Sequence, residues 1–489
     1  MSCKGRERGG RLGPVVSGLV AVLAVVLAAA CTSLDYELLR PHVLATDHEG
    51  RVVDVESEEA LEGCALRAHV GKLLTFAQEQ VAQRGIPAER ELLIHLHGGL
   101  NPANASLATA QAALRRMQAD PSAPHAIFIT WPSGAWSTWT DHLLRIRQGE
   151  RWPRWLGYLT APLILVTDVA KSIAVAPKTL FYQWYLDARV AGKVAFDVDL
   201  SQAMADEPLL VEAAAAAGYH LRRGSYRRGF LTQAGRFVTY WLSQPPKVFF
   251  QVFALNGLGQ GAWEVMLHRT RALFHAPDEF DLSGPEAGDP RAAARQVEGR
   301  DGQRLRAFFD ELYVRTCRDP TEADRCWNIT LVGHSMGAIV LNEVLAAYPE
   351  LPVRNLVYMA PACSLRDLEK VVVPYLEKHS DCRFFLLTLH PIAEADECYS
   401  VLPYYDLLPR GSLLEWIDNW YTTPPSMLDR VAGKWLNVVP ALQIFKNVRA
   451  RVYIKSFDVG NGAAPQKHGD FNSFDFWRPE FWWDARTAR

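Results

Sequence analysis

The sequence predicts an α/β fold, because short apolar stretches of strand length alternate with longer stretches whose apolar residues recur at helical spacing. The strand-like stretches are residues 91–97, 126–131, 328–332, 353–359, 383–389 and 451–457. The helix-like stretches include residues 61–84, 103–119, 338–347 and 365–378. Of the 489 residues, 49% are apolar and 22% are charged, which is the composition of a globular protein with a large core.

A Gly-x-Ser-x-Gly sequence stands between one of these strands and the helix that follows it. It comprises Gly333-His334-Ser335-Met336-Gly337, after the strand at 328–332 and before the Ala-rich helix at 338–347. In this context the pattern predicts a nucleophile elbow, a sharp turn that projects the serine above the sheet. The serine backbone is strained there and the helix passes close to the strand, so small residues are needed at 333 and 337. Ser335 is the predicted nucleophile.

The sequence Gly-His-Ser-Met-Gly-Ala resembles the elbow of the lipase and esterase branches of the α/β-hydrolase superfamily. This resemblance implies a doubly wound, mostly parallel sheet and a triad in the chain order serine, acid, histidine. The resemblance covers about residues 90–135 and 300–480. It therefore predicts a hydrolase core built from residues 91–135 and 301–489, with a largely helical insertion at residues 136–300.

The first core strand, at residues 91–97, ends in His97-Gly98-Gly99-Leu100. In the family this position belongs to the oxyanion loop. By that resemblance the backbone N–H groups of Met336 and of Gly99 or Leu100 would hold the oxyanion, and the glycines let the backbone approach a ligand. The alternative is a simple turn from a strand to a helix.

The triad acid is expected in the loop at residues 390–397, which follows the strand at 384–389. A carboxylate is needed there to hold the histidine tautomer and to stabilise the imidazolium that forms. Asp396 is the first choice and Glu394 the second, and the alternative is a solvated acidic loop. Asp458, after the last strand, is a further candidate.

His468 stands in a Gly-rich loop after the last strand, where the family places its general base. His390 is an alternative base, but it precedes the acid in the sequence and so breaks the expected order. We therefore predict the triad Ser335, Asp396 and His468.

The insertion at residues 136–300 is rich in aromatic and basic residues. Eight of the fifteen tryptophans lie between Trp131 and Trp263, interleaved with arginines, beside two apolar stretches at 161–176 and 248–267. Charged residues interrupt both stretches before 18 residues, so spanning helices are not expected. The pattern favours a lid over an apolar cleft or a contact with a membrane surface. The alternative is a helical insertion whose aromatic residues form its own core.

The N-terminus predicts export. Basic residues precede an apolar run at 12–30, and this pattern is typical of a signal peptide. Leu27-Ala28-Ala29-Ala30-Cys31 resembles a bacterial lipobox, which implies a signal at residues 1–31 and lipidation of Cys31. An uncleaved membrane anchor is the alternative. The chain would then be a lipid-anchored protein of the cell envelope, on the periplasmic side, with residues 32–90 as a tether, or a short strand pair, and a helix.

Six further cysteines would lie in an oxidising compartment, where disulfides form. Cys317 and Cys326 bracket a polar loop and are the predicted pair. Metal binding is less supported, because the sequence has no C-x-x-C pair and no His-rich spacing.

The sequence thus predicts an exported, membrane-tethered serine hydrolase of carboxylic esters, with lipid or another apolar acyl ester as its substrate. No cofactor is expected, and the net charge of −2 gives no reason to expect a nucleic-acid partner. An acyltransferase with the same triad is an alternative. A non-catalytic envelope protein that uses the fold for binding or scaffolding is another.

Overall fold

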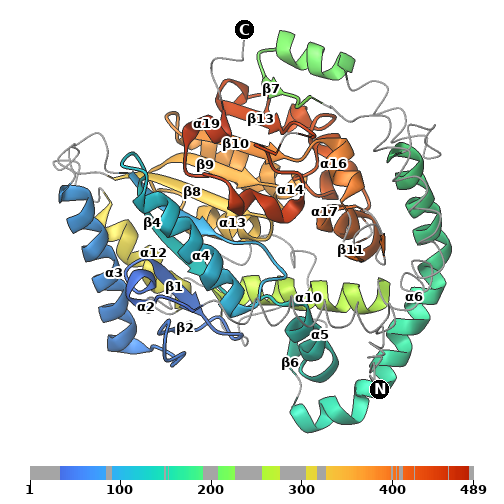
Figure 1. Cartoon of the computed structure of the whole chain (residues 1–489), viewed down its shortest axis with the longest axis horizontal. Coiled ribbons are helices and arrows are strands. Elements are labelled where there is room, and N and C mark those ends of the chain that lie inside the picture. The colour runs from blue at the N-terminus through green and yellow to red at the C-terminus, as the bar shows by residue number, and fades with distance from the viewer. Residues whose placement is uncertain are drawn as a thin grey trace, which may run out of the picture.

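The structure of the chain, a computed structural model, is shown in Figure 1. It describes residues 33–483 apart from 84–90, 148–149, 152, 191–207, 226–255, 276–303, 317–326, 398–399, 403–404, 407–410, 423 and 461. The predicted signal and Cys31 lie outside these residues, as does the predicted pair Cys317 and Cys326. Among the described cysteines, Cys64, Cys363 and Cys382 are free.

The core is a nine-stranded, mixed and mostly parallel sheet in the order β2-β1-β4-β3-β8-β9-β10-β13-β7. Its strands are β1 (Val43–Thr46), β2 (Val52–Val53), β3 (Glu91–Leu96), β4 (His125–Thr130), β7 (His220–Arg222), β8 (Asn328–His334), β9 (Val353–Met359), β10 (Arg383–Thr388) and β13 (Val452–Ser456). Only the pairing of β1 with β2 is antiparallel. Two small hairpins are separate, β5 (Ile146–Arg147) with β6 (Glu150–Arg151) and β11 (Ser400–Leu402) with β12 (Tyr405–Asp406). The predicted α/β fold is confirmed.

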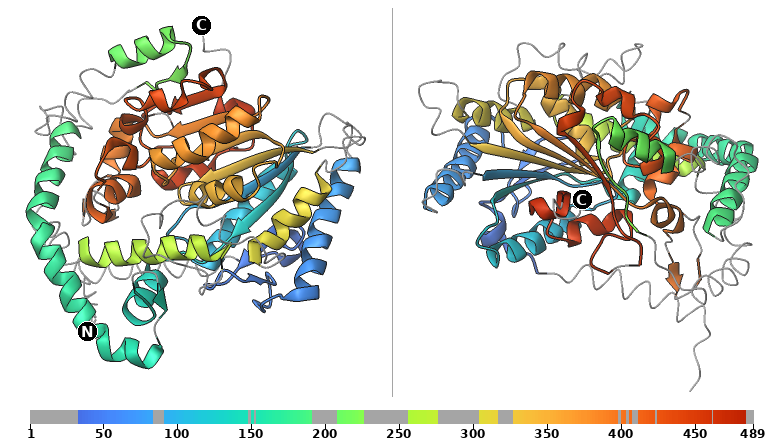
Figure 2. Two further views of the ribbon diagram at one scale, coloured as in Figure 1. Left: turned by 180° about the vertical axis from the view of Figure 1, so that it is seen from behind. Right: turned by 90° about the horizontal axis from the view of Figure 1, so that it is seen from above.

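Helices cover both faces of the sheet (Figure 2). The principal helices are α2 (Tyr36–Leu39), α3 (Gly63–Gln83), α4 (Ala103–Gln118), α5 (Ala135–Leu144), α6 (Arg154–Val190), α10 (Asn256–Ala272), α12 (Arg304–Arg315) and α13 (Gly337–Ala347). Shorter helices follow at α14 (Leu365–Asp367), α15 (Val373–Lys378), α16 (Pro391–Asp396), α17 (Leu413–Trp416), α18 (Trp435–Val438) and α19 (Pro479–Trp482). Because both faces are covered, the central strands are near-continuous apolar runs, and all six residues of β4 are buried.

Three strands enlarge the sheet beyond the predicted core. Residues 32–60 contain the strand pair β1 and β2, and β1 pairs with β4, so this segment belongs to the sheet and not to a tether. The strand β7 comes from the predicted insertion and pairs with β13 at the edge. A strand of three residues is too short for its alternation to be detected in the sequence.

The described part of the insertion is mainly helical, as predicted, and its helices α5, α6 and α10 pack on one another. The expectation that no helix of the insertion spans a membrane stays a prediction, and α6 is the helix to which it applies. Its segment Trp155–Lys178 is long and apolar enough to do so by length and composition, and no other helix of the described residues is. The helix and its apolar residues continue past Asp168 and Lys171. On the sequence alone, these two charged residues are expected to interrupt the apolar stretch.

The strand order reverses direction between β3 and β8. From β3 the chain proceeds to β4 on one side, and after the insertion it returns to β8 on the other side of β3. In an open parallel sheet, ligands bind at such a switch point, outside the carboxyl ends of the two strands. The turns after β3 and β8 are the two that contain the predicted site residues.

Candidate active site

The backbone of Ser335 adopts the left-handed conformation that a nucleophile elbow requires. Its φ is +52°, between the end of β8 and the start of α13. A Cβ on Gly333 would lie 2.9 Å from the backbone nitrogen of Ala338, and one on Gly337 would lie 2.3 Å from the carbonyl oxygen of Leu96. No side chain fits at either position, so both glycines are sterically required, as the sequence predicted.

The His-Gly-Gly turn after β3 packs directly on this elbow. A Cβ on Gly98 would lie 2.9 Å from Cβ of Ser335, and one on Gly99 would lie 2.5 Å from Sδ of Met336. The next residue, Leu100, has a φ of +65°. The structure therefore brings together Ser335, Met336, Gly99 and Leu100, four of the predicted site residues.

The carbonyl of Gly98 is held inside the turn by three donors. These are Nδ1 of His97 at 2.5 Å, Nδ2 of Asn101 at 3.1 Å and the hydroxyl of Ser133 at 3.5 Å. A trans peptide places its N–H opposite its carbonyl, so the N–H of Gly99 points away from these donors. This orientation leaves that N–H directed out of the loop, as an oxyanion donor has to be.

His468 lies beside the elbow, at the start of a short 3-10 helix (His468–Ser473) within the segment after β13. Its ring centroid is 5.1 Å from that of His334, the residue before Ser335. Nε2 of His334 donates to the carbonyl of His468 at 2.9 Å, and the N–H of His468 donates to Oε2 of Glu397 at 2.8 Å. Both backbone polar groups of His468 are thus fixed by buried side chains.

A polar bridge extends from this contact to β3. Since Nε2 of His334 carries the proton, its Nδ1 accepts from Nδ2 of Asn472 at 3.2 Å. Oδ1 of Asn472 in turn accepts from Nε2 of His95 at 3.1 Å. Asn472 therefore connects β3, β8 and the loop that holds His468.

Three reactive atoms at this place have no partner. Among the described residues, Oγ of Ser335 and both ring nitrogens of His468 are buried without a hydrogen bond. Burial and the neighbouring His334 hold the pKa of His468 well below 6.5, so its imidazole is neutral at pH 7. Unsatisfied buried polar atoms cost about 1–3 kcal/mol each and need an explanation, and a catalytic role is one such explanation.

The carboxylates after β10 lie at the same edge of the sheet, because β8, β10 and β13 are parallel. Asp396 is buried at the last position of α16. The next residue, Glu397, contacts the backbone of His468, as described above. The sequence interpretation did not select Glu397, although it lies in the same loop as the two chosen acids.

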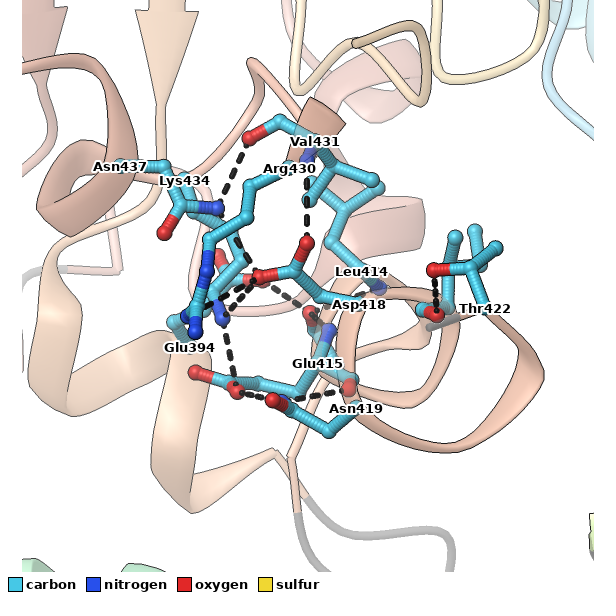
Figure 3. A network of polar contacts seen from close by, with 12 residues as sticks. Glu394, Leu414, Glu415, Asp418, Asn419, Thr422, Arg430, Val431, Lys434 and Asn437 are labelled. Carbon is cyan, nitrogen blue, oxygen red and sulfur yellow. Dashed lines mark hydrogen bonds and ion pairs between the residues drawn. The ribbon is translucent and has the colours of Figure 1, made fainter. Parts of the chain in front are cut away.

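Glu394 belongs to a different site. Its carboxylate accepts a hydrogen bond from Ser412, at the edge of a buried polar network around Glu415, Asp418 and Lys434 (Figure 3). Lys434 donates to Glu415 at 2.9 Å and to Asp418 at 3.3 Å. Burial raises the pKa of Glu394 to about 8, the hydrogen bond from Ser412 lowers it and the charge of Glu415 raises it. Glu394 is therefore largely protonated at pH 7.

The other two alternatives are also engaged. Asp458 accepts hydrogen bonds from the backbone and the hydroxyl of Ser225 at 2.5 and 3.0 Å, next to β7. Nδ1 of His390 accepts from the N–H of Ile392 at 3.1 Å and so caps the start of α16. These contacts give both side chains structural roles.

A cavity of about 460 Å³ lies beside α13, on the side that faces α10. Its lining mixes charges with apolar groups and includes Trp263, Arg271, Ile339, Glu343, Cys363, Asp367 and Lys370, but neither Ser335 nor His468. An acyl chain needs an apolar lining, so we do not assign this cavity to the acyl group. Within the described residues, no three His, Cys, Asp or Glu side chains are grouped so that they could hold a metal ion.

The sequence and the structure were compared with known proteins. No protein-family model, no curated protein and no solved structure matches the chain. An activity can therefore be argued only from the geometry of the site.

Proposed function

We propose that this chain is a serine hydrolase of carboxylic esters, of the α/β-hydrolase type, with Ser335, His468 and Asp396 as its triad. The observation that carries the proposal is the combination at the switch point between β3 and β8. There a serine with a φ of +52° lies beneath a glycine turn and beside a buried, neutral histidine. A fold that needed only packing would have no use for this arrangement.

The reaction follows the roles of these groups. Oγ of Ser335 attacks the acyl carbonyl while a ring nitrogen of His468 takes the hydroxyl proton and later passes it to the leaving alcohol. Water then attacks the acyl-enzyme, with His468 again as the base. The N–H of Met336, at the N-terminus of α13, and that of Gly99 or Leu100 stabilise the oxyanion, and two such donors contribute a few kcal/mol.

The acid we assign is Asp396, at the end of α16. It would hold the tautomer of His468 and stabilise the imidazolium. Glu394 does not suit this role, since a triad acid must be ionised and burial raises the pKa of Glu394 to about 8. Glu397 contacts the backbone of His468, and this contact positions the loop.

The substrates we propose are lipids or other apolar acyl esters, cleaved without a cofactor. The location we propose is the periplasmic side of the cell envelope, with Cys31 as the lipid attachment point. Support for both comes from the export signal and from the apolar surface of the insertion, where Trp155 and Leu159 are 66% and 71% exposed.

A fluorophosphonate probe tests the proposal, because it labels only an activated serine. We expect labelling of the intact protein and its loss in Ser335→Ala, with a cost of roughly 10⁶ in kcat on short-chain p-nitrophenyl esters. Ser57→Ala, at an exposed serine, is the matched control and should label normally. A silent wild-type protein, or a Ser335→Ala variant that keeps more than about a hundredth of the wild-type rate, refutes the assignment.

The second candidate is a non-catalytic envelope protein that uses the same fold for binding. It is favoured by one observation, namely that Oγ of Ser335 and the ring of His468 are not hydrogen-bonded. In catalytic serine sites, however, such bonds are often loose before the substrate binds. The probe separates the two candidates, since a binding module would not react.

A further inference from the structure

The helix α6 has its polarity inverted relative to a helix on the surface of a water-soluble protein. The face that packs on the protein is small or polar and includes Gly157, Asp168, Ser172 and Ala176, all buried. A Cβ on Gly157 would lie 2.0 Å from a backbone oxygen of α5, and Asp168 accepts from Nε2 of His142 at 2.9 Å. Small residues and satisfied polar groups at a helix contact are typical of helices whose other face meets lipid.

The opposite face of α6 is apolar and exposed. Of the thirteen large apolar side chains that are exposed in the described part of the chain, nine lie on α6. They are Trp155, Tyr158, Leu159, Leu163, Leu165, Val166, Ile173, Val175 and Phe181. Only 17% of the apolar window within Trp155–Lys178 is buried. In water such a continuous patch would be a liability, so a partner must cover it.

Five of these nine exposed residues define one stripe, whereas Tyr158, Leu165 and Val175 fall on the angular side of the buried residues. At about 100° per residue, the stripe residues fall within roughly 80° of one another around the helix, and they are Trp155, Leu159, Leu163, Val166 and Ile173. On the same scale, Lys171 and Lys178 lie roughly 60–80° beyond one edge of the stripe. Both lysines are exposed. An apolar stripe bordered by lysines, with aromatic rings at one end, fits the boundary between acyl chains and anionic headgroups.

From this geometry we infer that α6 docks the protein on a lipid bilayer by lying flat in the headgroup region, with the stripe facing the acyl chains. The inference rests on the proposed envelope location and not on the ester chemistry. It names the segment of the insertion that makes the membrane contact.

A flat orientation is favoured over a spanning one, although 24 residues of helix would reach about 36 Å and the hydrocarbon core is about 30 Å thick. The exposed Lys171 lies about 7 Å along the axis from the middle of this segment, where a spanning helix would place its charge deep in hydrocarbon. In addition, α6 runs along the outside of the body and packs on α5, α10 and α16 (Figures 1 and 2). A spanning α6 would pull these helices into the bilayer, together with the buried carboxyls of α16.

The contact with α16 also relates the bilayer to the candidate active site. α16 begins three residues after β10 ends, at the edge of the sheet where Ser335 and His468 lie. A bilayer on the stripe of α6 would therefore be separated from this edge by α6 and α16.

Depth-dependent fluorescence quenching tests the inference with the full chain in vesicles of phosphatidylethanolamine and phosphatidylglycerol at 7:3. The background carries Cys64→Ser, which removes the one thiol exposed among the described residues, and serine at the five cysteines outside them. In it the variants Leu159→Cys, Val166→Cys and Ile173→Cys each receive a fluorophore. Lipids brominated at successive acyl positions then report the depth of each label. Val314→Cys on α12 is the matched control, because Val314 and Ile173 are both β-branched and both 50% exposed.

We expect at least threefold stronger quenching at the three α6 positions than at Val314, with maxima at the same shallow bromine position. A depth profile that is deepest at Val166 and shallower on both sides overturns the flat orientation, since it is that of a spanning helix. Quenching no stronger than at Val314 overturns lipid as the partner and leaves a second copy of the chain, which concentration-dependent sedimentation would detect. The quenching does not depend on the reactivity of Ser335. It therefore tests the membrane contact of α6 separately from the hydrolase proposal, which fluorophosphonate labelling tests.

Discussion

Replacing Glu394 by glutamine tests whether this buried carboxyl is protonated, which is the reason for leaving it out of the proposed triad. The carboxyl group is buried, and its pKa is raised by that burial from 4.5 to about 8. Below about pH 4.5 it is protonated in the folded and unfolded chain alike. Between about pH 4.5 and 8 the folded chain binds the extra proton, so the free energy of unfolding falls as the pH rises. At 1.36 kcal/mol per pKa unit, the loss is on the order of 4 kcal/mol at pH 8.

Glutamine has nearly the same shape as the protonated acid, can accept from Ser412, and does not titrate. Urea unfolding of wild type and Glu394→Gln from pH 5 to 9 should therefore give curves that diverge by a few kcal/mol, with the variant gaining relative to wild type as the pH rises. Glu369→Gln, at an exposed carboxylate, is the control and should run parallel to wild type. Esterase activity of Glu394→Gln should stay within a few-fold of wild type. Parallel curves would show that Glu394 is ionised in the fold, and a loss of activity beyond 10³ in a folded variant would return it to the triad.

Three further predictions concern His468 and its supports. Asp396→Asn should lower kcat by on the order of 10⁴, and Glu397→Gln should cost at least tenfold less in the same p-nitrophenyl ester assay. The reverse order would assign the acid to Glu397. Asn472→Ala breaks the bridge between His95 and His334 and should lower kcat/KM by on the order of 10–100-fold. It should also lower the free energy of unfolding by about 1–3 kcal/mol, because buried ring nitrogens lose their partners. Wild-type activity in the folded variant would exclude a positioning role. As the pH falls, protonation of His468 removes the base, so kcat/KM should fall on the acid side. The midpoint of this fall should lie below pH 6.5, because burial lowers the pKa of His468. A midpoint above pH 6.5 contradicts the structure.

The parts of the fold that the sequence predicted are those with strong local signals. The helix α3 was expected from its spacing, and the residues expected inside are buried at Leu66, Val70, Leu73, Leu74, Ala77 and Val81. The elbow was recognised because a strand, a motif with two glycines and a helix follow one another within twenty residues. Gly333 and Gly337 are both required, because a side chain at either position would collide with neighbouring residues.

The parts that were missed depend on contacts between distant segments. The strand β7 is defined by its partner β13, which lies 230 residues further along the chain, and not by its own three residues. The role of Glu397 follows from a hydrogen bond to His468, 71 residues away, and nothing in the loop distinguishes it from Glu394. The inverted polarity of α6 became visible only when the structure showed which face packs on the protein, since apolar composition alone also fits a buried helix.

The distribution of backbone strain adds an argument that no single residue gives. Five residues other than glycine have a positive φ in the described part of the chain, and three of them are Leu100, Ser335 and Ala360. These three follow the neighbouring strands β3, β8 and β9, all at the carboxyl edge of the sheet. The buried network around Lys434 also reaches this edge, because Lys434 forms a bridge with Leu389 after β10, but there Lys434, Glu415 and Asp418 have partners. The strained backbone of Ser335 and the unsatisfied atoms of Ser335 and His468 thus coincide at the switch point, and each residue held in such a conformation costs about 1–3 kcal/mol. A fold retains strained residues at one site when its function requires that geometry. Ser335 and the turn at Gly98 and Gly99 are therefore the first place to test for catalytic activity.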